Sequence, residues 1–162
     1  HQNEVKFMAA SLQYSNYSND AAVAIPYEVM ARHEEETFLT TCRESMENYA
    51  SAVNMGLLND AAGYMAPQAL RNVLLISATP YQWKHMISQR ICRRNTSETR
   101  IVFLKIWEEL YRLNPSLFSR ATTGPFCIQG GCKEGKMSCG NMLSDWMTPK
   151  EQLQTDFPLL CD

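Results

Sequence analysis

The sequence predicts an α+β chain that is mostly helical, with few strands and a loop-rich, cysteine-containing C-terminal tail. Apolar residues recur every three or four positions over about 34–56 and again over about 96–114. This spacing indicates two amphipathic helices. Short apolar runs suited to strands are limited to VKFM near the start and VLLIS at 73–77. From about Ala121 the chain is rich in Gly, Cys and Pro, which predicts loops folded on the helices.

The longest helix is predicted from about Glu34 to Gly56. Three consecutive glutamates at its start suit the positive end of a helix dipole, and Gly56 suits its C-terminal stop. The apolar stripe that predicts this helix consists of Phe38, Cys42, Met46, Tyr49 and Val53.

The other elements follow from local signals. Residues 1–27 are polar and turn-rich, which predicts extended or looped chain. The run NDAAGYMAPQALRNVL predicts a turn and a short helix with Pro67 in its first turn. A third helix is predicted over about Pro80–Cys92. A fourth begins with Thr96 or Ser97 as N-cap and ends at Asn114-Pro115.

Composition sets limits on class and partners. With 162 residues, 45% of them hydrophobic, the chain can bury one core, so a single domain over 1–162 is expected. A net charge of -2 argues against a general nucleic-acid binder, which carries domain-wide positive charge. No apolar run reaches the length of a membrane span and no signal peptide opens the chain, so a cytoplasmic protein is expected.

The six cysteines are expected to be free thiols in a reducing compartment. The tail sequence CIQGGCKEGKMSC lacks the close C-x-x-C pair typical of zinc ribbons, so no metal site is predicted. A small zinc-binding module centred on Cys127–Cys139 remains the least favoured alternative. Cys92 falls in a helical pattern and is expected to pack in the core.

A basic cluster occupies residues 70–100. It holds five arginines, a lysine and a histidine, with Glu98 as its one acid, on a chain that is slightly acidic overall. Arginine offers a planar fork of donors that matches a phosphate or an imide edge, so Arg71, Arg90 and Arg94 are candidate anion contacts. Arg90 and Arg94 would share a face if one helix carried both. The alternative is a solvated basic face.

The order of the motifs resembles that of the flavin-dependent thymidylate synthases. The succession is ALRNVL, SAT, QWKHMISQR, SETR and LNPSLF, and the tail GPFCIQGGCKEGKMSCG is also similar to that of one branch of the family. The likeness runs from about Ser11 to Gly140. It implies helices packed on an antiparallel sheet and a homotetramer with active sites at subunit interfaces. It also implies conversion of dUMP to dTMP, with methylenetetrahydrofolate as carbon donor, FAD as cofactor and NADPH as reductant.

The resemblance assigns roles residue by residue. Arg71 matches the arginine that binds dUMP, and Arg90 matches the arginine that binds and activates the pyrimidine. His85 takes the place of a polar residue that contacts flavin, and Arg94 falls near the flavin nucleotide. The same register adds Ser11, Gln13 and Tyr14 to the dUMP site, and Tyr81 and His1 to the FAD site. No cysteine nucleophile is required.

The chain also departs from the family pattern. Of the signature RHRxxSxNExSxRY it keeps Ser11, Gln13 and Tyr14 but lacks the leading RHR and the internal acid, serine and arginine. About eight residues with a strand and a flavin-contacting arginine are missing between Thr79 and Pro80, where Tyr81 now stands at that arginine's register. The N-terminal strand-and-helix portion is missing too. Either the chain is a degenerate relative, or ligand-contacting segments are absent from this sequence, and we favour the second.

The leading hypothesis is therefore an FAD-dependent thymidylate synthase. Two alternatives stay open: a related dUMP-modifying reaction such as hydroxymethylation, and a non-catalytic binding or assembly protein on the same fold.

Overall fold

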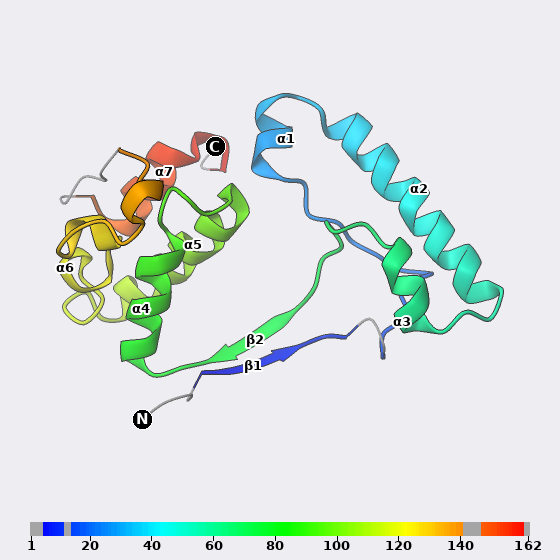
Figure 1. Ribbon diagram of the computed structural model, residues 1–162, viewed down its shortest axis with the longest axis horizontal. Coiled ribbons are helices and arrows are strands. Elements are labelled where there is room, and N and C mark those ends of the chain that lie inside the picture. Colours follow the sequence, from blue (N-terminus) through cyan, green and yellow to red (C-terminus); the bar gives the residue numbers. More distant parts are fainter. Residues whose placement is uncertain (1–4, 12–13, 141–146, 161–162) are drawn as a thin grey trace. The chain divides into compact units, whose positions relative to one another are not determined.

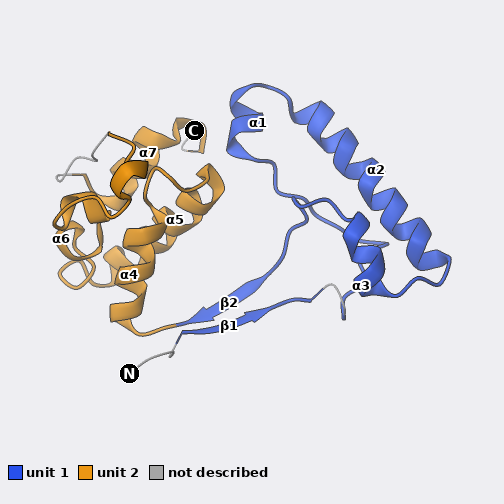
Figure 2. Cartoon of the chain, in the orientation of Figure 1, with its two compact units in different colours: residues 1–77 blue, residues 78–162 orange. Residues whose placement is uncertain are grey.

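The computed structural model describes residues 5–11, 14–140 and 147–160. The chain divides into two compact units, residues 1–77 and residues 78–162 (Figures 1 and 2). The expectation of a single domain over 1–162 stays a prediction, and each unit is described by itself.

The first unit is built around the long helix α2, Glu35–Asn54. Its bounds confirm the prediction from the apolar stripe, and Glu35 and Glu36 lie in its first turn. Gly56 follows with φ +91°, a conformation that glycine adopts without strain, so the predicted stop is also confirmed. The short helix α1, Tyr27–Ala31, was not predicted because five residues carry too little periodicity to recognise.

The predicted short helix near Pro67 was placed wrongly. Helix α3 covers Asn59–Ala62 and continues as the 3₁₀ helix η1, Gly63–Met65, so both precede this proline. Pro67 instead opens a turn in which the Leu70 amide donates to its carbonyl at 2.9 Å. The turn-forming Asn59-Asp60 pair starts the helix, because Asp60 in its first turn complements the helix dipole.

Two short strands form an antiparallel ribbon. Strand β1, Lys6–Ala9, pairs with β2, Leu74–Ser77, in the register Lys6↔Ser77 to Ala9↔Leu74. Seven of their eight residues are exposed. The resemblance implied helices packed on an antiparallel sheet. The described strands do not form such a sheet, because a two-stranded ribbon is too narrow to bury a face. The class is correct only in its coarser form, mostly helical with a small antiparallel sheet.

The core of the first unit is small. Tyr49 and Ala52 of α2 meet Ala62 of α3, and all three are at most 3% exposed. The Tyr49 hydroxyl accepts a hydrogen bond from the Tyr17 amide at 3.3 Å, which ties the segment before α1 to this core. The partly buried side chains packed around it are Tyr17, Met46, Val53 and Ala66.

The second unit is helical. It contains α4 (Pro80–Arg90), α5 (Ser97–Leu113), α6 (Arg120–Thr123), α7 (Pro149–Asp156) and the 3₁₀ helices η2 (Phe126–Ile128), η3 (Gly135–Met137) and η4 (Pro158–Leu160). Helix α5 packs against α4 and α7. The Trp107 indole is fully buried and donates to the Phe118 carbonyl at 2.8 Å. The other buried apolar side chains are Ile87, Ile91, Leu104, Phe118, Leu153 and Phe157.

Side-chain caps set the starts of the helices in the second unit. Thr79 and Gln82 form a capping box at α4, and Thr96 caps α5 as predicted. Helix α7 was predicted as loop, although Thr148 and Glu151 form a second capping box at its start and Pro149 follows at its first position.

Gly124 lies where two segments approach closely. A Cβ built at this position would lie 2.5 Å from the Arg120 carbonyl oxygen and 2.6 Å from the Ile128 Cδ1. The Gly124 amide donates to that same Arg120 carbonyl at 2.8 Å. The chain can leave α6 and enter η2 along this path because glycine carries no side chain.

Candidate functional site

Helix α4 carries three of the predicted site residues. Tyr81 is 81% exposed and lies one turn before His85, so the two rings share a face of the helix. The His85 ring is 5.6 Å from the Phe126 ring, centroid to centroid, at an interplanar angle of 55°. Arg90 is the last residue of α4 and is exposed, and the described residues offer its guanidinium no hydrogen-bond or ion-pair partner.

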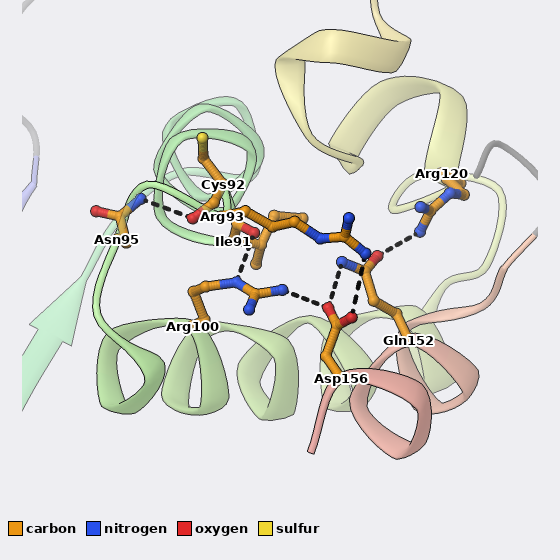
Figure 3. Close-up of polar contacts among 8 residues, drawn as sticks. All are labelled: Ile91, Cys92, Arg93, Asn95, Arg100, Arg120, Gln152 and Asp156. Carbon is orange, nitrogen blue, oxygen red and sulfur yellow. Dashed lines mark hydrogen bonds and ion pairs between the residues drawn. The ribbon is translucent and has the colours of Figure 1, made fainter. Parts of the chain in front are cut away.

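The turn after α4 corrects one expectation. The helix ends at Arg90, so Arg90 and Arg94 do not lie on one helical face. Arg94 stands instead in the turn between α4 and α5, exposed, with its Nη2 4.0 Å from the Met137 Sδ. Asn95 closes this turn by donating from Nδ2 to the Gln89 carbonyl at 2.9 Å. It also donates to the Cys92 carbonyl at 3.3 Å (Figure 3).

A buried carboxylate holds the same turn from the other side. Asp156, in the last turn of α7, forms ion pairs with Arg100 of α5 and, at 3.5 Å, with Arg93 of the turn (Figure 3). The Arg100 Nε also donates to the Ile91 carbonyl at 3.2 Å. The side chains of Arg100 and Asp156 are only 10% and 9% exposed, so this interaction is shielded from water.

A second layer supports Asp156. Gln152, one turn earlier on α7, donates to Asp156 at 3.4 Å and accepts from Arg120 Nη1 at 2.7 Å. The Arg100 guanidinium lies 5.0 Å from the centroid of the Phe157 ring, and that of Arg120 lies 5.7 Å from Trp107. The end of α4 is therefore anchored to both α5 and α7.

The basic cluster thus separates into two kinds of arginine. Arg93 and Arg100 are structural, because their charges are used inside the second unit. Arg90 and Arg94 present their charges at the surface, next to that rigid turn. A solvated basic face remains compatible with these exposures. Cys92, expected in the core, is only half-buried, since the helix ends two residues before it.

Arg71 belongs to the first unit. Its amide donates to the Ala22 carbonyl at 2.8 Å, and its exposed side chain lines a shallow groove with Tyr17, Pro67 and Asn72. The backbone at this position is therefore fixed while the guanidinium faces solvent.

Ser11 and Tyr14 lie in the same unit as Arg71. The Ala10 amide donates to the Val73 carbonyl at 3.1 Å, and the Asn72 Nδ2 donates to the Ala10 carbonyl at 2.9 Å. These bonds bring Ser11 beside the segment that carries Arg71. Tyr14 is 83% exposed on the turn that follows. Gln13 and His1 lie outside the described residues.

Sequence reasoning missed two positioning residues, Asn72 and Asp156. Asn72 also accepts from the Val73 amide at 2.7 Å, a local pattern for which asparagine in a turn is a weak signal. Nothing in the sequence pairs Asp156 with Arg93 and Arg100, because about sixty positions separate the partners.

Among the described residues, no helix combines the length and the apolarity that crossing a membrane requires.

Comparison with known proteins adds a family to this geometry. The family model described as thymidylate synthase complementing protein matches residues 1–116. A flavin-dependent thymidylate synthase of Geobacter sulfurreducens is 25% identical over 117 residues, which cover 72% of this chain and 50% of the relative. Enzymes of that name from Pyrococcus abyssi and Thermococcus kodakarensis are 31% and 33% identical over 98 and 86 residues, covering 58% and 51% of this chain and 40% and 35% of theirs. The chain spans at most half the length of these curated relatives.

Proposed function

The chain belongs to the thymidylate synthase complementing protein family, and on that premise we propose that it contributes to flavin-dependent methylation of dUMP to dTMP. The observation that supports this most is the exposed guanidinium of Arg90 at the end of α4, beside a turn fixed by Asp156 and Asn95. The backbone that carries this charge is fixed, while the guanidinium stays free to meet a ligand.

Arg90 is the proposed catalytic residue. Carbon five of uracil must become nucleophilic, and negative charge then accumulates on the ring oxygens. A positioned arginine stabilises that charge more strongly in the transition state than in the ground state. Arg71, with its backbone fixed and its side chain in solvent, is proposed to anchor dUMP together with Ser11, Gln13 and Tyr14.

The residues of α4 and of the turn after it fit FAD by their chemistry. Tyr81 and His85 offer two rings on one helix face for contact with a flat heterocycle, and Arg94 offers a cation for the flavin nucleotide's phosphates. His1 is proposed to join them. When bound, FAD supplies the redox chemistry, with methylenetetrahydrofolate as carbon donor and NADPH as reductant. The chain's own contribution is position and charge.

Self-association is part of the proposal. Tyr81, His85 and Arg94 lie on an open surface of the second unit, so a flavin there needs a further wall. A homotetramer would supply that wall from another copy. The compartment proposed is the cytoplasm, where thiols such as that of Cys42 stay reduced.

The test is release of tritium from dUMP labelled at carbon five, with the full-length protein supplied with FAD, methylenetetrahydrofolate and NADPH. Arg90→Ala should lower release by at least about 100-fold while leaving the urea midpoint unchanged, because this exposed side chain adds little packing. The matched control is Arg112→Ala, an exposed arginine of α5 paired with Glu109 at 2.7 Å, which should leave release unchanged. Wild-type release from the Arg90 variant would overturn the assignment.

Tyr81 gives a specific reason to keep a second candidate. A tyrosine stands, 81% exposed, at the register where the family pattern has a flavin-contacting arginine. An altered flavin contact would suit a related reaction such as hydroxymethylation of dUMP. The mass of the product separates the two, because dTMP as the sole product removes the second candidate. Failure to bind either dUMP or FAD would favour a non-catalytic binding or assembly protein.

A further inference from the structure

Four cysteines from two separate segments surround one small pocket of the second unit. Cys92 comes from the turn after α4, and the other three come from the tail beyond α6. All four line the same cavity, which has a volume of about 30 Å³. Such a space holds about one water molecule or one ion and is far too small for a nucleotide. The three cysteines of the tail are Cys127, Cys132 and Cys139.

The charges around this pocket suit a negatively charged centre. Arg93, Arg94 and Lys133 line it, together with Glu134. The Lys133 ammonium lies 5.5 Å from the Phe126 ring centroid, which holds that cation near the pocket. A zinc ion bound by four thiolates carries a net charge of −2, and Arg94 and Lys133 reduce it in part, because Arg93 is already paired with Asp156.

The tail that carries these cysteines is tied to α4 by Gln129, which donates to Ser88 at 2.8 Å, and by the ring contact of Phe126 with His85, but it contributes no buried side chain of its own. No residue from 126 to 140 is buried, and its regular structure is limited to the single-turn helices η2 and η3. Gly130, Gly131 and Gly135 have φ of +133°, +120° and +52°, so the path bends at residues that tolerate such angles. A segment without a core of its own commonly needs a disulfide or a metal to hold it.

We propose that Cys92, Cys127, Cys132 and Cys139 bind one structural zinc ion through four thiolates. In the described parts of the chain no three histidine, cysteine or acidic side chains are already gathered to hold an ion. Binding therefore draws the sulfurs inward, and the glycine-rich path of the tail allows that movement. The thiols release their protons to solvent as the zinc–sulfur bonds form. Such a site joins the tail to the turn that holds Arg94 and directly follows Arg90.

Zinc analysis of the purified full-length protein tests this proposal without any assay of dUMP chemistry. About one zinc per chain is expected, displaced by a thiol-reactive mercurial and restored once excess free thiol has removed the mercurial and zinc is added. Cys132→Ser and Cys139→Ser should each lose the metal, and both positions are exposed. The matched control is Cys42→Ser, a buried cysteine of α2 in the first unit, which should keep its zinc.

Cobalt gives an independent readout. Stripped wild-type protein titrated with Co²⁺ should develop the visible bands of a tetrahedral site and thiolate-to-metal charge transfer. Cys92→Ser should weaken the charge transfer. A wild-type protein that binds neither metal would overturn the proposal. If Cys161→Ser lost zinc while Cys92→Ser kept it, the assignment of Cys92 as the fourth ligand would be overturned.

Discussion

The two units of the chain differ in how they treat their large apolar side chains. The second unit buries Trp107, Phe118 and Phe157 around α5. The first unit buries Tyr49 but leaves most of its ribbon in solvent, with Met8 70% and Leu75 64% exposed. Tyr64, at 94%, is more exposed still.

This difference shows which unit buries a core of large side chains. Exposed large apolar side chains that gather on a small protein mark surfaces suited to contact with a ligand, a membrane or another protein surface. A two-stranded ribbon is marginal by itself, so the ribbon is the least self-supporting part of the first unit. The second unit closes its own core. Helix α4 packs on that core, so the backbone that carries the candidate residues is held in place.

The largest expected effect is in the core of the second unit. Trp107→Ala should lower the free energy of unfolding by about 3–5 kcal/mol, because it opens a cavity and leaves the Phe118 carbonyl without its donor. Urea denaturation measures the loss, and amide hydrogen exchange locates it. Leu75→Ala is the matched change in the first unit. It should barely change the free energy of unfolding of dilute protein, because the Leu75 side chain is 64% exposed. Equal loss of amide protection in both units after Trp107→Ala would contradict the expectation that the effect is confined to the second unit.

Removal of the clamp at the end of α4 should come next. Asp156→Ala leaves the charges of Arg93 and Arg100 without their carboxylate and should cost on the order of 3 kcal/mol. Amide exchange should rise in the turn around Cys92. Asp20→Ala, at an exposed carboxylate of the first unit, serves as the control and should change neither quantity. A turn that stays protected without Asp156 would show that Asn95 alone is sufficient.

The cap of α4 should have a smaller effect. Thr79→Ala removes the side chain that accepts from the Gln82 amide and should cost about 1 kcal/mol. Thermal unfolding followed by circular dichroism measures it. Thr41→Ala lies on the exposed side of α2 and should be neutral or slightly stabilising, since alanine favours a helix interior. An equal loss from both variants would argue against the cap.

The smallest effect concerns pH. Hydrogen bonds from the Thr148 amide and hydroxyl lower the pKa of the Glu151 carboxyl. Its contribution to stability is therefore present above the ordinary glutamate pKa and is lost as the pH falls through the lower, folded value. Glu151→Gln should be slightly less stable than the wild type at neutral pH and equal to it in acid. Urea midpoints across that range measure the gap, and a constant gap would contradict the assignment.

Local signals predicted the elements that are long or capped. The stripe of α2 and the Thr96 cap of α5 are patterns within one segment, so the sequence contains all that is needed. Helix α7 could have been predicted from Thr148, Pro149 and Glu151, but the Gly, Cys and Pro content of the chain from about Ala121 suggested loop. The four-residue spacing of Arg90 and Arg94 misled because the helix ends between them.

The surroundings of the candidate site were beyond local reasoning. The pairing of Asp156 with Arg93 and the place of Cys92 beside the tail cysteines depend on tertiary contacts between distant segments. The spacing of the tail alone identifies three cysteines. The fourth, Cys92, is found beside them only in the folded chain.

Gly124 has a consequence for reading natural variation in this chain. Any other amino acid there would have to displace backbone at Arg120 and the Ile128 side chain, so no replacement is conservative. A substitution at position 124 should therefore lower the amount of folded protein. Loss of function in such a variant would not by itself assign a role to the cysteine tail that follows.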